Sequence, residues 1–189
     1  MTNPILLDFP DSFETERLII RCPQPGSGAA VNAAVLESLE ELRLWMPWAQ
    51  NAPSLEESEE NCRRWRARFL AREDLTLHLF LKDGAFVGSS GLHRINWEVP
   101  KFEIGYWCRT SQQGRGYITE AVRGIMDFAF AQLHAERVEI RCDARNEKSR
   151  RVAERAGFAL EACLRREARD HCGALRDTLI FALLRDGNL

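Results

Sequence analysis

Apolar residues recur at every third or fourth position in three long segments, which is the spacing of an amphipathic α-helix. The first segment runs over residues 31–42 and is broken by WMPWAQNAP at residues 45–53. Ser54 and Glu57 then form a capping-box pattern, which predicts the start of a second helix. The third and longest segment covers residues 118–133. The pattern therefore predicts three amphipathic helices, each with one face toward a core.

A fourth, shorter helix is predicted between Asn146, which suits an N-cap, and Gly157, which suits a helix end. Strand-like runs separate the helices, and Asp83-Gly84 indicates a hairpin between two of them. These runs lie at residues 17–22, 77–82, 86–95, 102–109, 137–144, 158–166 and 177–185. The order is strand, two helices, three strands, helix, strand, helix and two strands. It predicts an α/β (α+β) fold, with residues 1–189 forming a single domain around one mixed, mostly antiparallel sheet.

Composition narrows the class of protein. The chain has 189 residues, of which 45% are hydrophobic and 29% charged, and its formal net charge is −2. This balance gives no general attraction to nucleic acid or to an anionic membrane. The N-terminus shows no secretory signal and no apolar stretch is long enough to cross a bilayer, so we expect a cytoplasmic protein.

The cysteines show no pattern of a metal site or a disulfide framework. They are scattered, with no C-x-x-C pair and no histidine at ligand spacing. The six positions are Cys22, Cys62, Cys108, Cys142, Cys163 and Cys172. We expect reduced thiols and no metal.

The most informative short stretch is SQQGRGYITEAV at residues 111–122, where two glycines precede a helical pattern. Successive N–H groups at a glycine-rich turn into a helix form a pocket for an anion, and Arg115 adds a positive charge. The spacing is not that of a Walker loop, and Thr119 stands where a dinucleotide fingerprint would have its third glycine. By itself the pattern fits a plain tight turn equally well.

The surrounding residues give the turn a context. Gln113-Gly114-Arg115-Gly116-Tyr117-Ile118, preceded by EIGYW, resembles the acyl-CoA pyrophosphate loop [QR]-x-x-G-x-[GA] of the GCN5-related N-acetyltransferases (GNAT). Ile118 departs from the small residue of that signature. ETERLIIR, WMPW, ARNEKSRRVAERAGF and LRDTLIFALL resemble the RimJ/RimL branch of N-terminal protein acetyltransferases. The resemblance extends over nearly the whole chain.

The resemblance implies a fold and a cosubstrate, acetyl-CoA. The fourth and fifth strands of the family's sheet splay apart, and the pantetheine arm pairs with the fourth, which here is residues 103–108. The diphosphate would lie on the N–H groups of residues 113–119. The residues implied to bind acetyl-CoA are Tyr106, Trp107, Cys108, Gln113, Gly114, Arg115, Gly116, Tyr117, Ile118, Thr119 and Asn146.

Aminolysis of a thioester needs an acid, a base and an oxyanion donor. Ala153 occupies the position where many family members carry the tyrosine that acts as general acid. Ser149, four residues earlier on the same helix face, is the expected acid, as in the resembled branch. Its hydroxyl could instead serve only the cap of its own helix. The oxyanion donor would be a backbone N–H at Trp107 or Cys108.

The base is less defined. Glu103, Glu167 and Asp170 are candidates, and each could equally be a solvated surface carboxylate. An α-amine, with a pKa near 8, has a neutral fraction that needs no dedicated base. Cys142 falls on the apolar side of its predicted strand, which disfavours covalent catalysis.

The acceptor side is expected at the WMPW segment, where Trp45, Met46 and Trp48 would bind substrate or else pack in the core. We expect transfer of acetyl from acetyl-CoA to a primary amine, by direct attack in a ternary complex. The favoured acceptor is a protein N-terminus of ribosomal-protein type. A polyamine or aminoglycoside acceptor and a non-catalytic acyl-CoA-binding module are the alternatives. The sequence leaves homodimerisation open.

Overall fold

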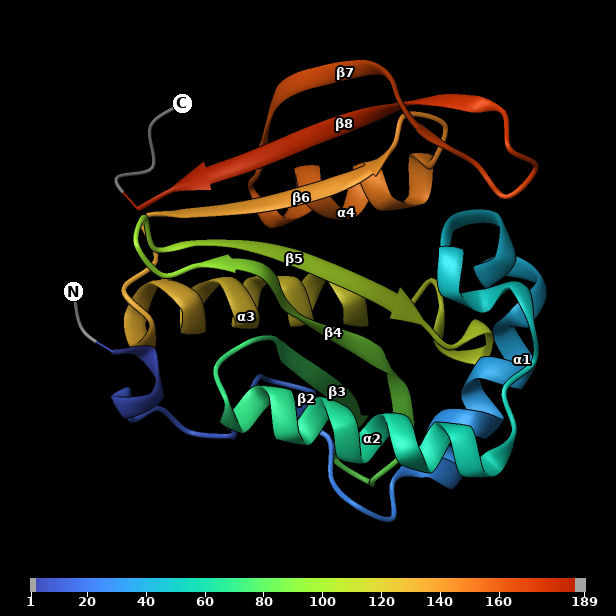
Figure 1. The fold of residues 1–189 in the computed structure, drawn as a ribbon, viewed down its shortest axis with the longest axis vertical. Coiled ribbons are helices and arrows are strands. Elements are labelled where there is room, and N and C mark those ends of the chain that lie inside the picture. Colours follow the sequence, from blue (N-terminus) through green and yellow to red (C-terminus); the bar gives the residue numbers. More distant parts are fainter. Residues whose placement is uncertain (1–2, 186–189) are drawn as a thin grey trace.

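The computed structural model describes residues 3–185, which form one eight-stranded sheet with four α-helices against it (Figure 1). The strands lie in the order β1-β2-β3-β4-β5-β6-β8-β7. The strands are β1 (Ser12–Glu14), β2 (Leu18–Arg21), β3 (Leu75–Leu81), β4 (Phe86–Asn96), β5 (Lys101–Cys108), β6 (Arg137–Asp143), β7 (Ala159–Arg169) and β8 (Leu175–Leu184). The α-helices are α1 (Gly28–Trp45), α2 (Leu55–Leu70), α3 (Tyr117–Gln132) and α4 (Glu147–Ala156), and the short 3-10 helices are η1 (Pro4–Leu6), η2 (Pro47–Gln50) and η3 (Thr110–Gln112).

The order of elements confirms the predicted fold, with one strand more than expected. That strand, β1, has three residues and pairs with β2. Its polar, half-exposed sequence SFE is too short to show an alternation, so the pattern did not reveal it. No helix among residues 3–185 has the combination of length and apolar character needed to cross a membrane.

Local signals set the helix ends as expected. Ser54 and Glu57 make both hydrogen bonds of the capping box at the start of α2. The side chain of Asn146 caps α4, and Gly157 ends it with a φ of 96°, which favours glycine. α1 stops at Trp45, just before the proline of WMPW. Each end depends on residues close in sequence, which is why the sequence could predict it.

The sheet parts between β5 and β6, its only parallel neighbours among the described strands. Their pairing covers three residues on each strand, Lys101–Glu103 against Arg137–Glu139. Beyond that point β5 continues to pair with β4 alone, out to Cys108. The splayed opening between the fourth and fifth expected strands is therefore confirmed, although β1 makes them the fifth and sixth of the chain.

Helices pack on both faces of the sheet, and strand alternation places neighbouring side chains of β5 on opposite faces. The ring of Trp107 packs beside Phe86, next to residues of α1 and α2. Tyr106 instead turns toward α4, where its hydroxyl meets Ser149. The opening can consequently be reached by side chains from both faces.

Candidate active site

A cleft of about 460 Å³ lies where β5 and β6 part. The end of α1, η2, the β7–β8 turn and the start of α4 complete its walls. Of the predicted site residues, the cleft brings together Trp45, Met46, Glu103, Tyr106, Asn146, Ser149 and Asp170. Trp48 and Glu167 do not line it. A larger groove of about 840 Å³ lies beside β1 and α3, but none of the predicted catalytic residues lines it.

The hydroxyls of Ser149 and Tyr106 lie 2.9 Å apart inside this cleft. The cap of α4 uses only the N–H of Ser149, which donates to Asn146, so the serine hydroxyl is left for Tyr106. Burial raises the pKa of Tyr106 far above its ordinary value, so the phenol keeps its proton. The protonated phenol therefore fixes the position of the serine hydroxyl. The resemblance implied a role for Tyr106 only through the backbone of its strand. The alternation within EIGYW could have shown that its ring lies on the opposite face from that of Trp107.

Glu103 comes from the other face of the sheet, at the last residue pair before β5 and β6 separate. Burial raises the pKa of its carboxyl, although the guanidinium of Arg94, 3.4 Å away, opposes the rise. A carboxyl with a raised pKa holds a proton more firmly once it has accepted one. Glu103 and the Ser149–Tyr106 pair thus approach the opening from opposite sides.

The other two base candidates are held by arginines. Glu167 accepts hydrogen bonds from Arg141 and Thr178, each at 2.8 Å, and does not line the cleft. Asp170 does line the cleft, but Arg145 donates to it at 3.1 Å. Burial would raise the pKa of Asp170, yet hydrogen bonds from Arg145 and from two backbone N–H groups lower it overall. Neither carboxylate is placed to take a proton as Glu103 is.

Asp170 belongs to a group with His171 and Cys172 whose potential metal-ligand atoms lie within 4.8 Å of one another. One oxygen of Asp170 accepts from the N–H groups of Cys172 and Ala174, and the other accepts from Arg145. These hydrogen bonds give the carboxylate of Asp170 a structural role, because they hold together the turn between β7 and β8.

The glycine-rich turn has the form of an anion pocket. Gly114 and Gly116 have φ values of 75° and 81°, in the left-handed region that glycine favours. Within residues 3–185, the N–H groups of residues 114–119 donate to no other protein group. The N–H of Gln113 donates to the carbonyl of Thr110, so the series of free N–H groups begins at residue 114 and not at residue 113 as expected. Arg17 stabilises the turn by donating to the carbonyl of Arg115 at 3.0 Å.

Along the free edge of β5, the backbone N–H and C=O groups of every second residue point into the opening. The N–H of Arg109 donates to Val87 of the β4 segment, and Cys108 lies opposite Gly88 in the register. In an antiparallel ladder, residues 105 and 107 therefore bond to β4, while residues 104, 106 and 108 direct their backbone groups the other way. Of the two expected oxyanion donors, the register favours Cys108 and places the N–H of Trp107 in the ladder.

Trp45 and Met46, two of the residues expected to bind the acceptor, line the cleft at the junction of α1 and η2. Trp48 packs edge-on against Trp107 with ring centroids 6.1 Å apart, and 54% of it is exposed. Cys142 lines the cleft as well, but burial raises the pKa of its thiol, which disfavours the thiolate needed for covalent catalysis.

Comparisons with known proteins identify the family of the chain. Residues 17–159 match the family model of the acetyltransferase (GNAT) domain. The chain is 32% identical over 174 residues to YdaF of Bacillus subtilis (strain 168), named as a candidate ribosomal N-acetyltransferase, covering 90% of this chain and 92% of that protein. It is 29% identical over 126 residues to a ribosomal-protein-serine acetyltransferase of Escherichia coli (strain K12), covering 65% and 70% of the two chains.

Solved structures share the fold over almost the full length. RimL, a ribosomal-protein α-N-acetyltransferase in complex with coenzyme A, superposes with a TM-score of 0.85 at 22% identity, covering 92% of this chain and 97% of its own. The microcin C7 self-immunity acetyltransferase MccE, in complex with acetyl-CoA and AMP, gives the same TM-score at 20% identity, with 93% and 97% covered. On the match of the family model and the close relationship to YdaF, the chain belongs to the GNAT family of acetyltransferases.

Proposed function

We propose that this protein transfers the acetyl group of acetyl-CoA to the N-terminal α-amine of a protein, within a ternary complex. The observation that carries the proposal is the arrangement around the parted strands. A free strand edge, a buried carboxyl and a paired hydroxyl meet at one opening, and the turn between β5 and α3 carries a series of free N–H groups. The names of the relatives, ribosomal-protein acetyltransferases, support a protein acceptor.

The residues present suit acetyl-CoA, which when bound supplies the acetyl thioester. The N–H groups of residues 114–119 offer donors to a diphosphate at the positive end of the α3 dipole. A Cβ added to Gly114 would meet nothing within 4 Å, so the turn leaves open space on that side. The backbone of residues 104, 106 and 108 can pair with the amides of a pantetheine arm, as an edge strand pairs with an added strand.

Proton movement follows from the two faces of the sheet. Glu103 accepts a proton from the incoming amine, and its raised pKa makes it a stronger base than an ordinary carboxylate. The hydroxyl of Ser149 gives a proton to the departing sulfur and regains one from solvent, while the phenol of Tyr106 keeps its own proton and holds that hydroxyl in place across 2.9 Å. The N–H of Cys108, on the open edge, is the donor placed for the developing negative charge on the carbonyl oxygen.

A second candidate function is acetylation of a small amine, which the fold shared with MccE in complex with acetyl-CoA and AMP favours. A polyamine fits this cleft less well, because it would need several uncommitted carboxylates. Asp143 and Asp170 are both paired with Arg145. Glu103 is the remaining carboxylate of the lining.

An acceptor screen that detects free coenzyme A thiol tests the proposal. N-terminal peptides should be acetylated with a higher kcat/KM than spermidine or an aminoglycoside. Trp45→Ala should raise the peptide KM while acetyl-CoA affinity stays near that of the unchanged protein, and Trp48→Ala, outside the cleft, is the matched control. Efficient turnover of a small amine with no activity on any peptide would contradict the proposed acceptor. Tight acetyl-CoA binding without turnover of any amine would instead indicate a non-catalytic module.

A further inference from the structure

The cleft is lined by more positively than negatively charged side chains, and some of these side chains have no partner of opposite charge in the described part of the chain. Four arginines face three carboxylates. The arginines are Arg43, Arg141, Arg169 and Arg176, and the carboxylates are Glu103, Asp143 and Asp170. Asp143 and Asp170 form a paired set with arginines near β6, and Glu103 is paired with Arg94. Two exposed arginines of the lining, which mark the mouth of the cleft, have no carboxylate partner among residues 3–185 and form the unpaired set.

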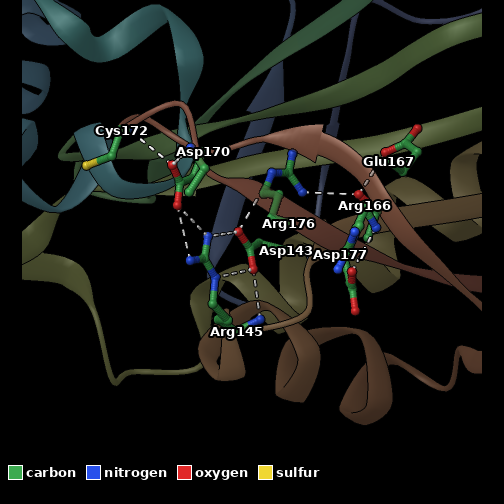
Figure 2. A network of polar contacts seen from close by, with 10 residues as sticks. Asp143, Arg145, Arg166, Glu167, Asp170, Cys172, Arg176 and Asp177 are labelled. Atoms are coloured by element: carbon green, nitrogen blue, oxygen red, sulfur yellow. Dashed lines mark hydrogen bonds and ion pairs between the residues drawn. The ribbon is translucent and has the colours of Figure 1, made fainter.

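The paired set is held together by Arg145, which is not itself part of the lining (Figure 2). Its guanidinium lies 2.7 Å from Asp143 and 3.1 Å from Asp170, so one cation serves both carboxylates. Arg176 lies 3.7 Å from Asp143 on its other side, and Arg141 pairs with Glu167 at 2.8 Å. These carboxylates are therefore already matched by cations of the protein.

The unpaired set consists of Arg43 and Arg169. Neither has a carboxylate within 4.0 Å among residues 3–185. Arg43 stands in the last turn of α1, and Arg169 ends β7, so they come from two different walls. Arg169 donates to the carbonyl of Gly173 at 2.6 Å, which fixes one side of its guanidinium and leaves its other donors for a partner.

Such an arrangement attracts an anion to the mouth and repels a second cation. A guanidinium binds a carboxylate through two parallel hydrogen bonds, the strongest neutralising contact available to it. The side chain of Glu103, by contrast, is only 17% exposed and offers its carboxylate to an amine inside the cleft. An acceptor that matches both ends carries an amine at its tip and a carboxylate further along.

We infer that the preferred acceptor is an N-terminal peptide with Asp or Glu among the first residues after its α-amine. This inference rests on the proposed function and names the substrate class of the same site. An extended peptide spans roughly 3.3–3.6 Å per residue, so a carboxylate at positions 2 to 5 covers the reach from the interior of a cleft to its mouth. Trp45 and Met46 add apolar side chains to the same lining.

The test is a scan of N-terminal hexapeptides in which a single Asp, Asn or Lys is moved through positions 2 to 5. Acetylation is followed by release of coenzyme A thiol. At one or more positions, Asp should give a kcat/KM about tenfold above Asn, the scale expected of one charge-assisted pair, and Lys should fall below Asn. Arg43→Gln and Arg169→Gln should each reduce the preference for Asp, and Arg169→Glu should turn it toward Lys.

Arg165→Gln is the matched control, because Arg165 is an exposed arginine on the same strand that does not line the cleft. It should leave the preference unchanged, and all variants should keep the acetyl-CoA affinity of the unchanged protein. Acetylation of Asp, Asn and Lys peptides with equal efficiency would overturn the inference and leave the proposed function standing. No acetylation of any peptide, with acetyl-CoA bound and a small amine turned over, would overturn the proposed function and this inference with it.

Discussion

The phenol oxygen of Tyr106 lies 2.9 Å from the hydroxyl oxygen of Ser149, and the same phenol reaches the carbonyl of Ser149 at 3.1 Å. One residue comes from β5 and the other from the first turn of α4, two elements separated by the whole of α3 and β6. Ser149 thus has a partner for its proton that its own helix would not supply. This relationship makes the two side chains one functional unit.

Removing either hydroxyl should slow the chemical step. Ser149→Ala should lower kcat by about 100-fold, the usual scale for one proton-transfer group, with little change in acetyl-CoA affinity. Tyr106→Phe should have a smaller effect, and the double variant should be no slower than Ser149→Ala alone, because groups that act as a unit are not additive. Single-turnover kinetics and calorimetry measure the two quantities. Full turnover in Ser149→Ala, with chemistry limiting the rate, would show that the serine only supports its helix.

Glu103 and Glu167 can be separated by their pH profiles. Burial raises the pKa of Glu103, so protonation should weaken it as a base at a higher pH than an ordinary carboxyl. The activity of the unchanged protein should fall on the acid side for this reason, and Glu103→Gln should lose both rate and that acid limb. Glu167→Gln, which removes a partner of Arg141 outside the cleft, is the control and should keep the limb. A profile that is unchanged in Glu103→Gln would show that the α-amine needs no dedicated base.

The turn at Gly116 should be required for cosubstrate binding. Its φ of 81° makes valine costly there, whereas the nearest atom to an added Cβ, a nitrogen of Arg17, is at an ordinary 3.5 Å. The strain should distort the N–H series and weaken acetyl-CoA binding by about 2 kcal/mol, comparable to a lost hydrogen bond to a charged group. Gly84→Val carries the same kind of strain in the β3–β4 turn, at a φ of 89°. It should lower stability but not acetyl-CoA affinity; equal losses of affinity in both variants would remove the anion pocket from this turn.

His78 should make the protein sensitive to acid. It is 1% exposed, its two ring nitrogens have no hydrogen-bond partner, and burial lowers its pKa from 6.5 to about 4, with Arg21 adding to the effect. Between these pH values the unfolded chain binds the proton and the folded protein does not. The contribution of His78 to stability is thus complete above pH 6.5 and is lost as the pH falls toward 4.

By pH 4.5 this loss should amount to about 2 to 3 kcal/mol of unfolding free energy, given the shift in pKa. Urea denaturation at pH 7.5 and 4.5 measures it. His78→Leu places an apolar side chain that cannot be protonated against the rings of Trp65 and Phe86. The stability of this variant should fall less with acid. His171→Leu, at an exposed position, should follow the unchanged protein. Parallel pH curves for all three would contradict the assignment.

Sequence reasoning succeeded where the cause was local. The capping box of α2 and the Asn146 cap of α4 depend on residues a turn apart, and both formed as expected. The choice among Glu103, Glu167 and Asp170 could not be made from the chain, because the arginines that engage the last two come from β6 and the loop after it. Likewise, nothing in the sequence favoured Trp45 over Trp48 as a cleft residue. Only the turn of η2 after Pro47 decides which of them faces the cleft.

The short parallel pairing of β5 with β6 has a mechanical consequence. In the described part of the chain, the ladder between the five-stranded and the three-stranded part of the sheet consists of three residue pairs. Opening motions should concentrate at this neck, since few backbone hydrogen bonds resist them. A ligand that binds along residues 104–108 would add contacts between the two parts of the sheet beyond those that the chain itself makes. Amide hydrogen exchange of Ile104, Tyr106 and Cys108 would then report how stiffly the two parts of the sheet move together.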